Sequence, residues 1–240
     1  SRRQCPLAFP QMNLGSTLLI ASALEATALA VLVLFRERRS ISQRCFVAGM
    51  LVLGGEALVA ALSLRYSTPA LKLHWERLRL LFIGLAPGVW LLFALTYARG
   101  NYREFVREWK IPLAAAFVLP AATAVVFHRL LLVDTVEAFP GGPLIPRMGW
   151  AGSAIHVFFL LSIVFVLMQL ERTLRESVVT MRWRIKFMVI GLCVIFGTRI
   201  YTSTQSVLYS SGSFSLAVLD ACGLLAGGLL ILRSIFRMHL

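Results

Sequence analysis

Five ionisable side chains lie inside long apolar runs of this sequence, where a charge needs a partner. They are Glu25, Glu56, His156, Arg199 and Asp220. At such a depth in a bilayer, an arginine costs about 2.5–3.5 kcal/mol on insertion scales, so Arg199 should face protein or water and contact an acid. Two kinds of site would meet this need: a buried ion pair that fixes helix register, or a polar cavity that binds a ligand or a proton.

The positions of these groups along their runs predict a shared layer. At about 1.5 Å per residue, Arg199, Asp220, His156 and Glu56 lie roughly 9–12 Å below one membrane boundary, and Glu25 lies deeper, near the midplane. Arg199 and Asp220 are on consecutive runs and form the simplest pair, with Glu56 as the competing acid. Three acids facing one arginine leave surplus negative charge, so at least one acid is expected to be neutral at pH 7. The predicted network comprises Arg199, Asp220, Glu56, His156, Glu25, Tyr201 and Gln205.

No other set of residues has catalytic or metal-binding spacing. The four cysteines are far apart and form no CxxC pair, which indicates neither a disulfide framework nor a metal site. The sequence has no HExxH, P-loop, GxSxG or Gly-rich nucleotide motif. We therefore predict no catalytic residue, metal or cofactor within these residues, and the sequence leaves enzyme activity open.

The composition is that of a membrane protein. Of the 240 residues, 58% are hydrophobic and only 15% are charged, and the mean hydropathy is +0.79. Soluble domains have about 45–50% apolar and about 25% charged residues. The net charge of +13 would suggest nucleic acid or an anionic surface for a soluble protein. Here basic loops beside a membrane explain it, so we predict contact with membrane lipids and none with nucleic acid.

Seven runs of about 20 predominantly apolar residues predict an all-α, polytopic integral membrane protein. The predicted spans are Leu14–Phe35, Cys45–Leu64, Leu78–Ala98, Ile111–Phe127, Trp150–Leu170, Ile185–Gln205 and Phe214–Leu232. The loops on one side carry fifteen Lys and Arg residues and those on the other carry eight, which with Arg199 account for all 24. By the positive-inside rule, the N-terminus is predicted outside and the C-terminus in the cytoplasm.

These spans divide the chain into three parts. Residues 1–13 are expected to form an extracytoplasmic segment, and those before Met12 could be non-native. Residues 14–232 are the predicted seven-helix domain, and 233–240 a cytoplasmic tail leading to an output domain outside these residues. The third and seventh spans carry small-xxx-small patterns, Gly84–Gly88 and Gly223–Gly227, which favour either dimerisation or tight packing within the chain.

The passage Thr180–Gln205, TMRWRIKFMVIGLCVIFGTRIYTSTQ, is the most distinctive in the chain. A tryptophan and basic residues precede an apolar run that ends in R-x-Y-x-x-(S/T)-Q. This passage, together with APGVWLLFALTYARG in the third span, resembles the membrane region of bacterial sensor histidine kinases of the PEP-CTERM/exosortase-associated type. The resemblance extends from Met12 to the end of the chain. It gives Arg199, Tyr201 and Gln205 no known ligand role.

The resemblance implies the signal-input module of a two-component sensor in the bacterial inner membrane. In that family a GAF-like domain and a kinase core follow the membrane helices, and neither is within these residues. The implied partners are a cytoplasmic kinase output domain in the same full-length protein, a response regulator and a second copy in a homodimer. A small stand-alone transporter or channel is the alternative, because it would use the same intramembrane charges as a permeation path.

Overall fold

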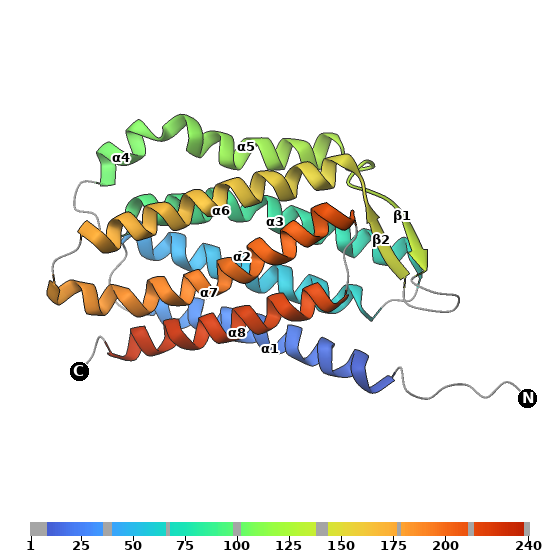
Figure 1. The fold of residues 1–240 in the computed structure, drawn as a ribbon, viewed down its shortest axis with the longest axis horizontal. Helices are drawn as coiled ribbons and strands as arrows, with labels where there is room; N and C mark the ends of the chain where they lie inside the picture. Colours follow the sequence, from blue (N-terminus) through green and yellow to red (C-terminus); the bar gives the residue numbers. More distant parts are fainter. Residues whose placement is uncertain are drawn as a thin grey trace, which may run out of the picture.

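The computed structural model is almost entirely helical (Figure 1). It describes residues 9–35, 40–65, 68–97, 102–137, 144–176, 179–210 and 214–237. The helices are α1 (Phe9–Leu34), α2 (Ile41–Ser63), α3 (Pro69–Thr96), α4 (Tyr102–Glu108), α5 (Lys110–Val126), α6 (Trp150–Glu176), α7 (Val179–Tyr209) and α8 (Phe214–Arg237). Two strands, β1 (Leu132–Glu137) and β2 (Leu144–Met148), join α5 to α6.

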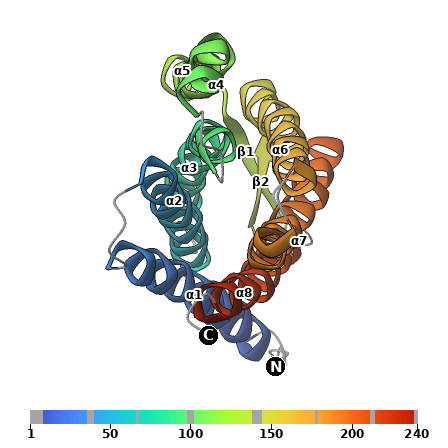
Figure 2. The same cartoon turned by 90° about the vertical axis from the view of Figure 1, so that its left-hand side faces the viewer.

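Six long helices form a closed ring, which is seen end-on in Figure 2. Each helix packs on the next in the order α1, α2, α3, α6, α7 and α8, and α8 returns to α1. Helix α5 lies outside this ring against α3 and α6. The first and last helices of the described chain are therefore neighbours, and the ring closes between them.

Within the described residues, six helices are long and apolar enough to cross a membrane: α1, α2, α3, α6, α7 and α8. The fourth predicted span, Ile111–Phe127, corresponds to α5, which is apolar but has only 17 residues. The prediction of an all-α membrane protein is thus confirmed, and α5 is the shorter helix that would make a seventh span. Of the predicted terminal segments, residues 1–8 and 238–240 lie outside the described residues, whereas α1 starts at Phe9 and α8 extends to Arg237.

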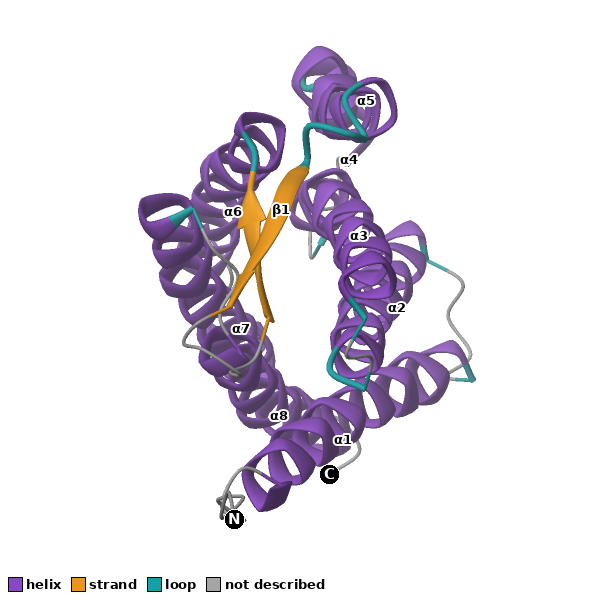
Figure 3. Cartoon of the chain, turned by 90° about the vertical axis from the view of Figure 1, so that its right-hand side faces the viewer, coloured by secondary structure: helices purple, strands orange, loops and turns teal. Residues whose placement is uncertain are grey.

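The longest predicted loop, between the fourth and fifth spans, contains an antiparallel hairpin instead of irregular chain. Leu132 pairs with Met148 and Glu137 with Leu144, with one irregularity in register between Leu132 and Asp134. The hairpin lies at one end of the ring (Figure 3). The Met148 N–H donates to the carbonyl of Ser210, at the end of α7, over 2.8 Å. We call this the hairpin end; the turn between α2 and α3 lies there too.

Both small-xxx-small patterns serve packing within the chain. A Cβ at Gly88 would lie 2.6 Å from the Phe117 ring of α5, and one at Gly223 would lie 2.5 Å from Thr198 Oγ1 of α7. Further along α8, a Cβ at Gly227 would meet the carbonyl of Gly191 at 2.6 Å. The two patterns therefore bring α5 onto α3 and α8 onto α7, as expected for small residues at helix contacts in membranes.

Aromatic side chains pack together inside the ring of helices, where the start of α2 and the end of α3 meet α7. Trp90 is fully buried and meets Phe196 edge-on, with 5.1 Å between ring centroids. Phe46 and Phe93 pack on the same indole at 6.1 and 5.6 Å. A Cβ at Gly49 would lie 2.7 Å from the Trp90 ring, so a glycine there lets α2 approach the indole. We call Trp90, Phe196, Phe46 and Phe93 the aromatic layer.

Candidate functional site

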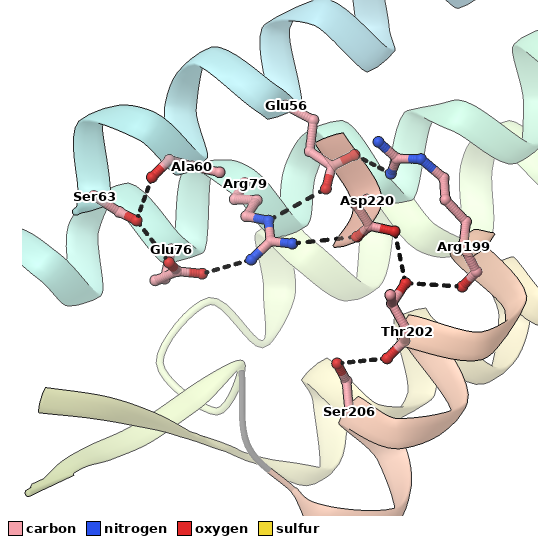
Figure 4. A network of polar contacts seen from close by, with 9 residues as sticks. All are labelled: Glu56, Ala60, Ser63, Glu76, Arg79, Arg199, Thr202, Ser206 and Asp220. Atoms are coloured by element: carbon pink, nitrogen blue, oxygen red, sulfur yellow. Dashed lines mark hydrogen bonds and ion pairs between the residues drawn. The ribbon is translucent and has the colours of Figure 1, made fainter. Parts of the chain in front are cut away.

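Glu56 is the centre of a polar network between four helices (Figure 4). It lies on α2, and its carboxylate oxygen Oε2 accepts a short hydrogen bond from Arg199 Nη1 of α7. The glycines just before it bring the neighbouring helices close: a Cβ at Gly54 would lie 3.2 Å from Ala26 Cβ of α1, and one at Gly55 would meet the Phe82 ring of α3 at 2.5 Å. Close packing on both sides therefore holds Glu56 inside the ring.

Arg79 of α3 joins three acids from three helices. Its Nε donates to Glu56 Oε1 over 3.2 Å. Its Nη1 lies 3.6 Å from Glu76 Oε2 on the same helix, and its Nη2 lies 3.8 Å from Asp220 Oδ2 on α8. The fixed fork of a guanidinium suits such multiple contacts. Through Arg79, α3 is linked to both α2 and α8.

Asp220 is held more loosely than Glu56. Its Oδ1 accepts a hydrogen bond of 2.8 Å from the Thr202 hydroxyl of α7. Among the described residues, the only partner of its other oxygen is Arg79, at 3.8 Å. The predicted Arg199–Asp220 pair is not formed. Arg199 pairs with Glu56, the alternative acid, whereas Asp220 contacts Arg79 and Thr202. Equal depth along the helices was the basis of the expected Arg199–Asp220 pair, but depth does not fix which helix faces which.

A small cavity of about 20 Å³ adjoins the network, with room for about one water molecule. Its lining includes Glu56, Arg79, His156, Arg199 and Asp220, so α2, α3, α6, α7 and α8 all contribute. His156 is 8% exposed, and its Nδ1 has no hydrogen-bond partner among the described residues. Binding sites for drug-sized molecules are about 300–1,000 Å³. The cavity fits a water molecule or a proton and excludes a larger solute.

Three residues of the predicted network lie away from this cavity. Glu25 is on α1, and a Cβ at Gly228 of α8 would lie 2.7 Å from its carboxyl carbon; both carboxylate oxygens are buried with no hydrogen-bond partner among the described residues. Tyr201 is 53% exposed on the outside of α7. Gln205 is half-buried and is not part of the cavity lining. The structure thus brings together Glu56, His156, Arg199 and Asp220, and separates the other three.

No donor set for a metal ion is found in the part of the chain that the structure describes. There, no three His, Cys, Asp or Glu side chains lie close enough together to hold one. The acids of the network face arginines, whose guanidinium groups already occupy the positions that a cation would need. The arrangement suits charge pairing and proton exchange.

Comparison with known proteins identifies the family. The sequence model of the N-terminal 7TM region of histidine kinase matches residues 18–240. The chain belongs to this family. Among curated proteins, none matches the chain. The polar network of this histidine kinase region lies within its membrane helices: Glu56, Arg79, Arg199 and Asp220 all fall inside the stretches of α2, α3, α7 and α8 that are apolar enough to span a bilayer.

Arg79 is the residue of the histidine kinase region that sequence reasoning missed. The third predicted span starts at Leu78, so Arg79 is its second residue and the prediction counts it with the basic residues near the membrane surface. In the structure α3 starts at Pro69, after Thr68 in extended conformation. Threonine followed by proline is a helix-start signal, and Glu76 and Arg79 have the spacing of an ion pair on one helix face. These two signals together could have placed Arg79 inside the helix.

Proposed function

We propose that this histidine kinase region receives an envelope signal at its hairpin end, and that the network around Arg79 and Arg199 transmits it to α8. The observation that carries the proposal is the position of Asp220. This acid lies on the last membrane helix, and it contacts Arg79 of α3 and Thr202 of α7. A change of charge or hydrogen bonding in the network therefore acts directly on α8.

The orientation that we propose places the N-terminus and the hairpin end outside and the C-terminus in the cytoplasm of a bacterial inner membrane. Arg79 supports this orientation, because its guanidinium is engaged by Glu56 and Asp220 inside the polar network and no longer counts as an outer loop charge. Fifteen basic residues then face seven, which widens the asymmetry that the positive-inside rule uses. The basic side chains at the cytoplasmic side would contact anionic lipid headgroups.

The proposed mechanism is a two-state change of helix packing. Helices α2, α3, α7 and α8 share one set of ion pairs, so occupation or protonation of the network favours one arrangement over another. The two states would differ by a few kcal/mol, which a single ion pair can shift. Residues 14–232 would form the sensing domain, and residues 233–240 the connection to the output domain.

The family implies a kinase output domain in the full-length parent. We propose that the parent works as a homodimer, passes phosphate to a response regulator and belongs to the PEP-CTERM/exosortase-associated type. Both glycine patterns are engaged within the chain, so the dimer would use another surface, such as the lipid-facing side of α1, which exposes Leu24 and Val31.

The test is autophosphorylation of the full-length kinase in membranes. Asp220→Asn should change the basal rate by about 5-fold or more in either direction, as expected for coupling between distant sites. Leu229→Ala is the matched control, because Leu229 is on the same helix but 61% exposed. If Asp220→Asn and Leu229→Ala both behave like the parent, the network does not take part in signalling and the proposal is wrong.

A further inference from the structure

The acids of the network differ in how costly it is for each to lose its negative charge by taking up a proton. Both oxygens of Glu56 are engaged, one by Arg79 and the other by Arg199. Arg199 contacts no other acid among the described ion pairs. If Glu56 took up a proton, Arg199 would lose its carboxylate inside the membrane, where an unpaired arginine is costly. Glu56 is therefore the acid least suited to accept a proton.

Asp220 can be neutralised without stranding a cation. Arg79 would keep its contacts with Glu56 at 3.2 Å and Glu76 at 3.6 Å. The Asp220 oxygen that faces Arg79 is 3.8 Å away, beyond hydrogen-bond distance. A proton on that oxygen would thus cost one long ion pair and no hydrogen bond. Asp220 is the acid for which the neutral form is best tolerated.

The groups that face Asp220 are defined for each neighbouring helix. Arg79 faces it from α3, Glu56 from α2, Arg199 and Thr202 from α7, and His156 lines the same cavity from α6. From α1, only the apolar Leu19 lines the space beside Asp220 among the described residues, so that helix adds no titratable group there. His156 is poorly suited to carry positive charge, since its buried Nδ1 has no acceptor among the described residues and both N–H groups of an imidazolium need one.

We propose that the ligand of this cavity is a proton, that Asp220 binds it, and that a single water molecule beside His156 and Arg199 delivers it. This inference rests on the proposed sensory role of the network and names its stimulus by chemical class. The cavity of about 20 Å³ has room for one water molecule and excludes a solute. A neutral Asp220 no longer attracts Arg79, so α8 is released from α3 while the close glycine contacts keep it on α7.

The test is an infrared titration of the chain in lipid nanodiscs, from about pH 5.5 to about pH 9, which lies above the range in which exposed carboxyl groups titrate. The probe is the C=O stretching band of a protonated carboxyl. Every variant carries Glu25→Gln, because Glu25 is a second buried carboxyl that could contribute a band. We expect one band that disappears as pH rises, that is lost in Asp220→Asn and that persists in Glu76→Gln.

A second variant keeps the inference open to refutation if Asp220→Asn fails to fold. Thr202→Val removes the hydroxyl that donates to Asp220 and stabilises its ionised form. The protonated form then persists to higher pH, so the midpoint of the band should rise by about one pH unit. A band that survives in Asp220→Asn, the absence of any pH-dependent band, or an unchanged midpoint in Thr202→Val would overturn the inference.

Infrared spectroscopy detects proton binding whether or not the kinase responds. A band assigned to Asp220 would therefore stand even if autophosphorylation showed that the network does not signal. Conversely, a network that controls the kinase without this band would keep its sensory role and exclude the proton as its ligand. The two measurements separate failure of this inference from failure of the proposed function.

Discussion

Glu56 and Glu25 are two acids on consecutive helices with opposite surroundings. Glu56 is held by arginines on both oxygens and is 3% exposed. Glu25 has buried carboxylate oxygens too, but no hydrogen-bond partner among the described residues, and it lies against the bare backbone of Gly228. The first acid joins α2 to α3 and α7, and the second lies where the ring closes between α1 and α8.

The two acids should therefore contribute to stability in different ways, Glu56 through its charge and Glu25 through the shape of its side chain. Removing Glu56 would leave Arg199 without an acid and take one of three acids from Arg79, so its charge contributes to the packing of three helices. Among the described residues, Glu25 has no counter-ion to strand, and a lone buried carboxylate is costly. Its shape and volume should matter more than its charge. Three predictions, from the largest effect to the smallest, test this contrast.

The largest effect is expected for Glu56→Leu. Leaving Arg199 without an acid should cost about 3–5 kcal/mol of unfolding free energy. Arg199→Leu should cost less, because Glu56 keeps Arg79 at 3.2 Å. The double variant Glu56→Leu/Arg199→Leu should recover part of the loss. Unfolding in mixed micelles with increasing SDS, followed by tryptophan fluorescence, measures these values; a Glu56→Leu variant as stable as the parent would refute the structural role of the pair.

An intermediate effect is expected where α1 meets α8. In Gly228→Ala, the new methyl group would lie 2.7 Å from the carboxyl carbon of Glu25. The carboxyl is the end of a flexible side chain and can move, so we expect a loss of about 1 kcal/mol. Adding Glu25→Ala should restore the stability of Gly228→Ala, measured by the same SDS unfolding. Additive losses in the double variant would show that the two residues do not touch.

The smallest effect is expected for Glu25→Gln, which keeps the shape of the side chain and removes its charge. The unfolding free energy should change by less than about 0.5 kcal/mol. Glu56→Gln is the matched control, and it should cost about 1.5–3 kcal/mol, because it replaces hydrogen bonds between charged groups. Equal losses for the two glutamine variants would contradict the contrast between the two acids.

The sequence was sufficient for the long membrane helices and for grouping four of the charged side chains, because apolar length and position along a helix are local properties. Glu56, His156, Arg199 and Asp220 do line one cavity, and Glu25 lies apart from it. The partner of Arg199 was not predictable in the same way, since it depends on how the helices turn toward one another. The hairpin was missed because a strand pair of six and five residues is short and gives little periodicity.

The aromatic layer has a consequence for the energetics of the cell. A bacterial membrane stores energy as a proton gradient, and a polar path through a protein would drain it. Trp90 and Phe196, both fully buried, fill the ring of helices beyond the charged groups, and Phe46 and Phe93 close around them. Within the described residues, these buried rings are the side chains that the proposed proton on Asp220 would have to pass on the side away from the hairpin end. With this layer in place, binding of the proposed proton from one side does not require that protons be conducted across the membrane.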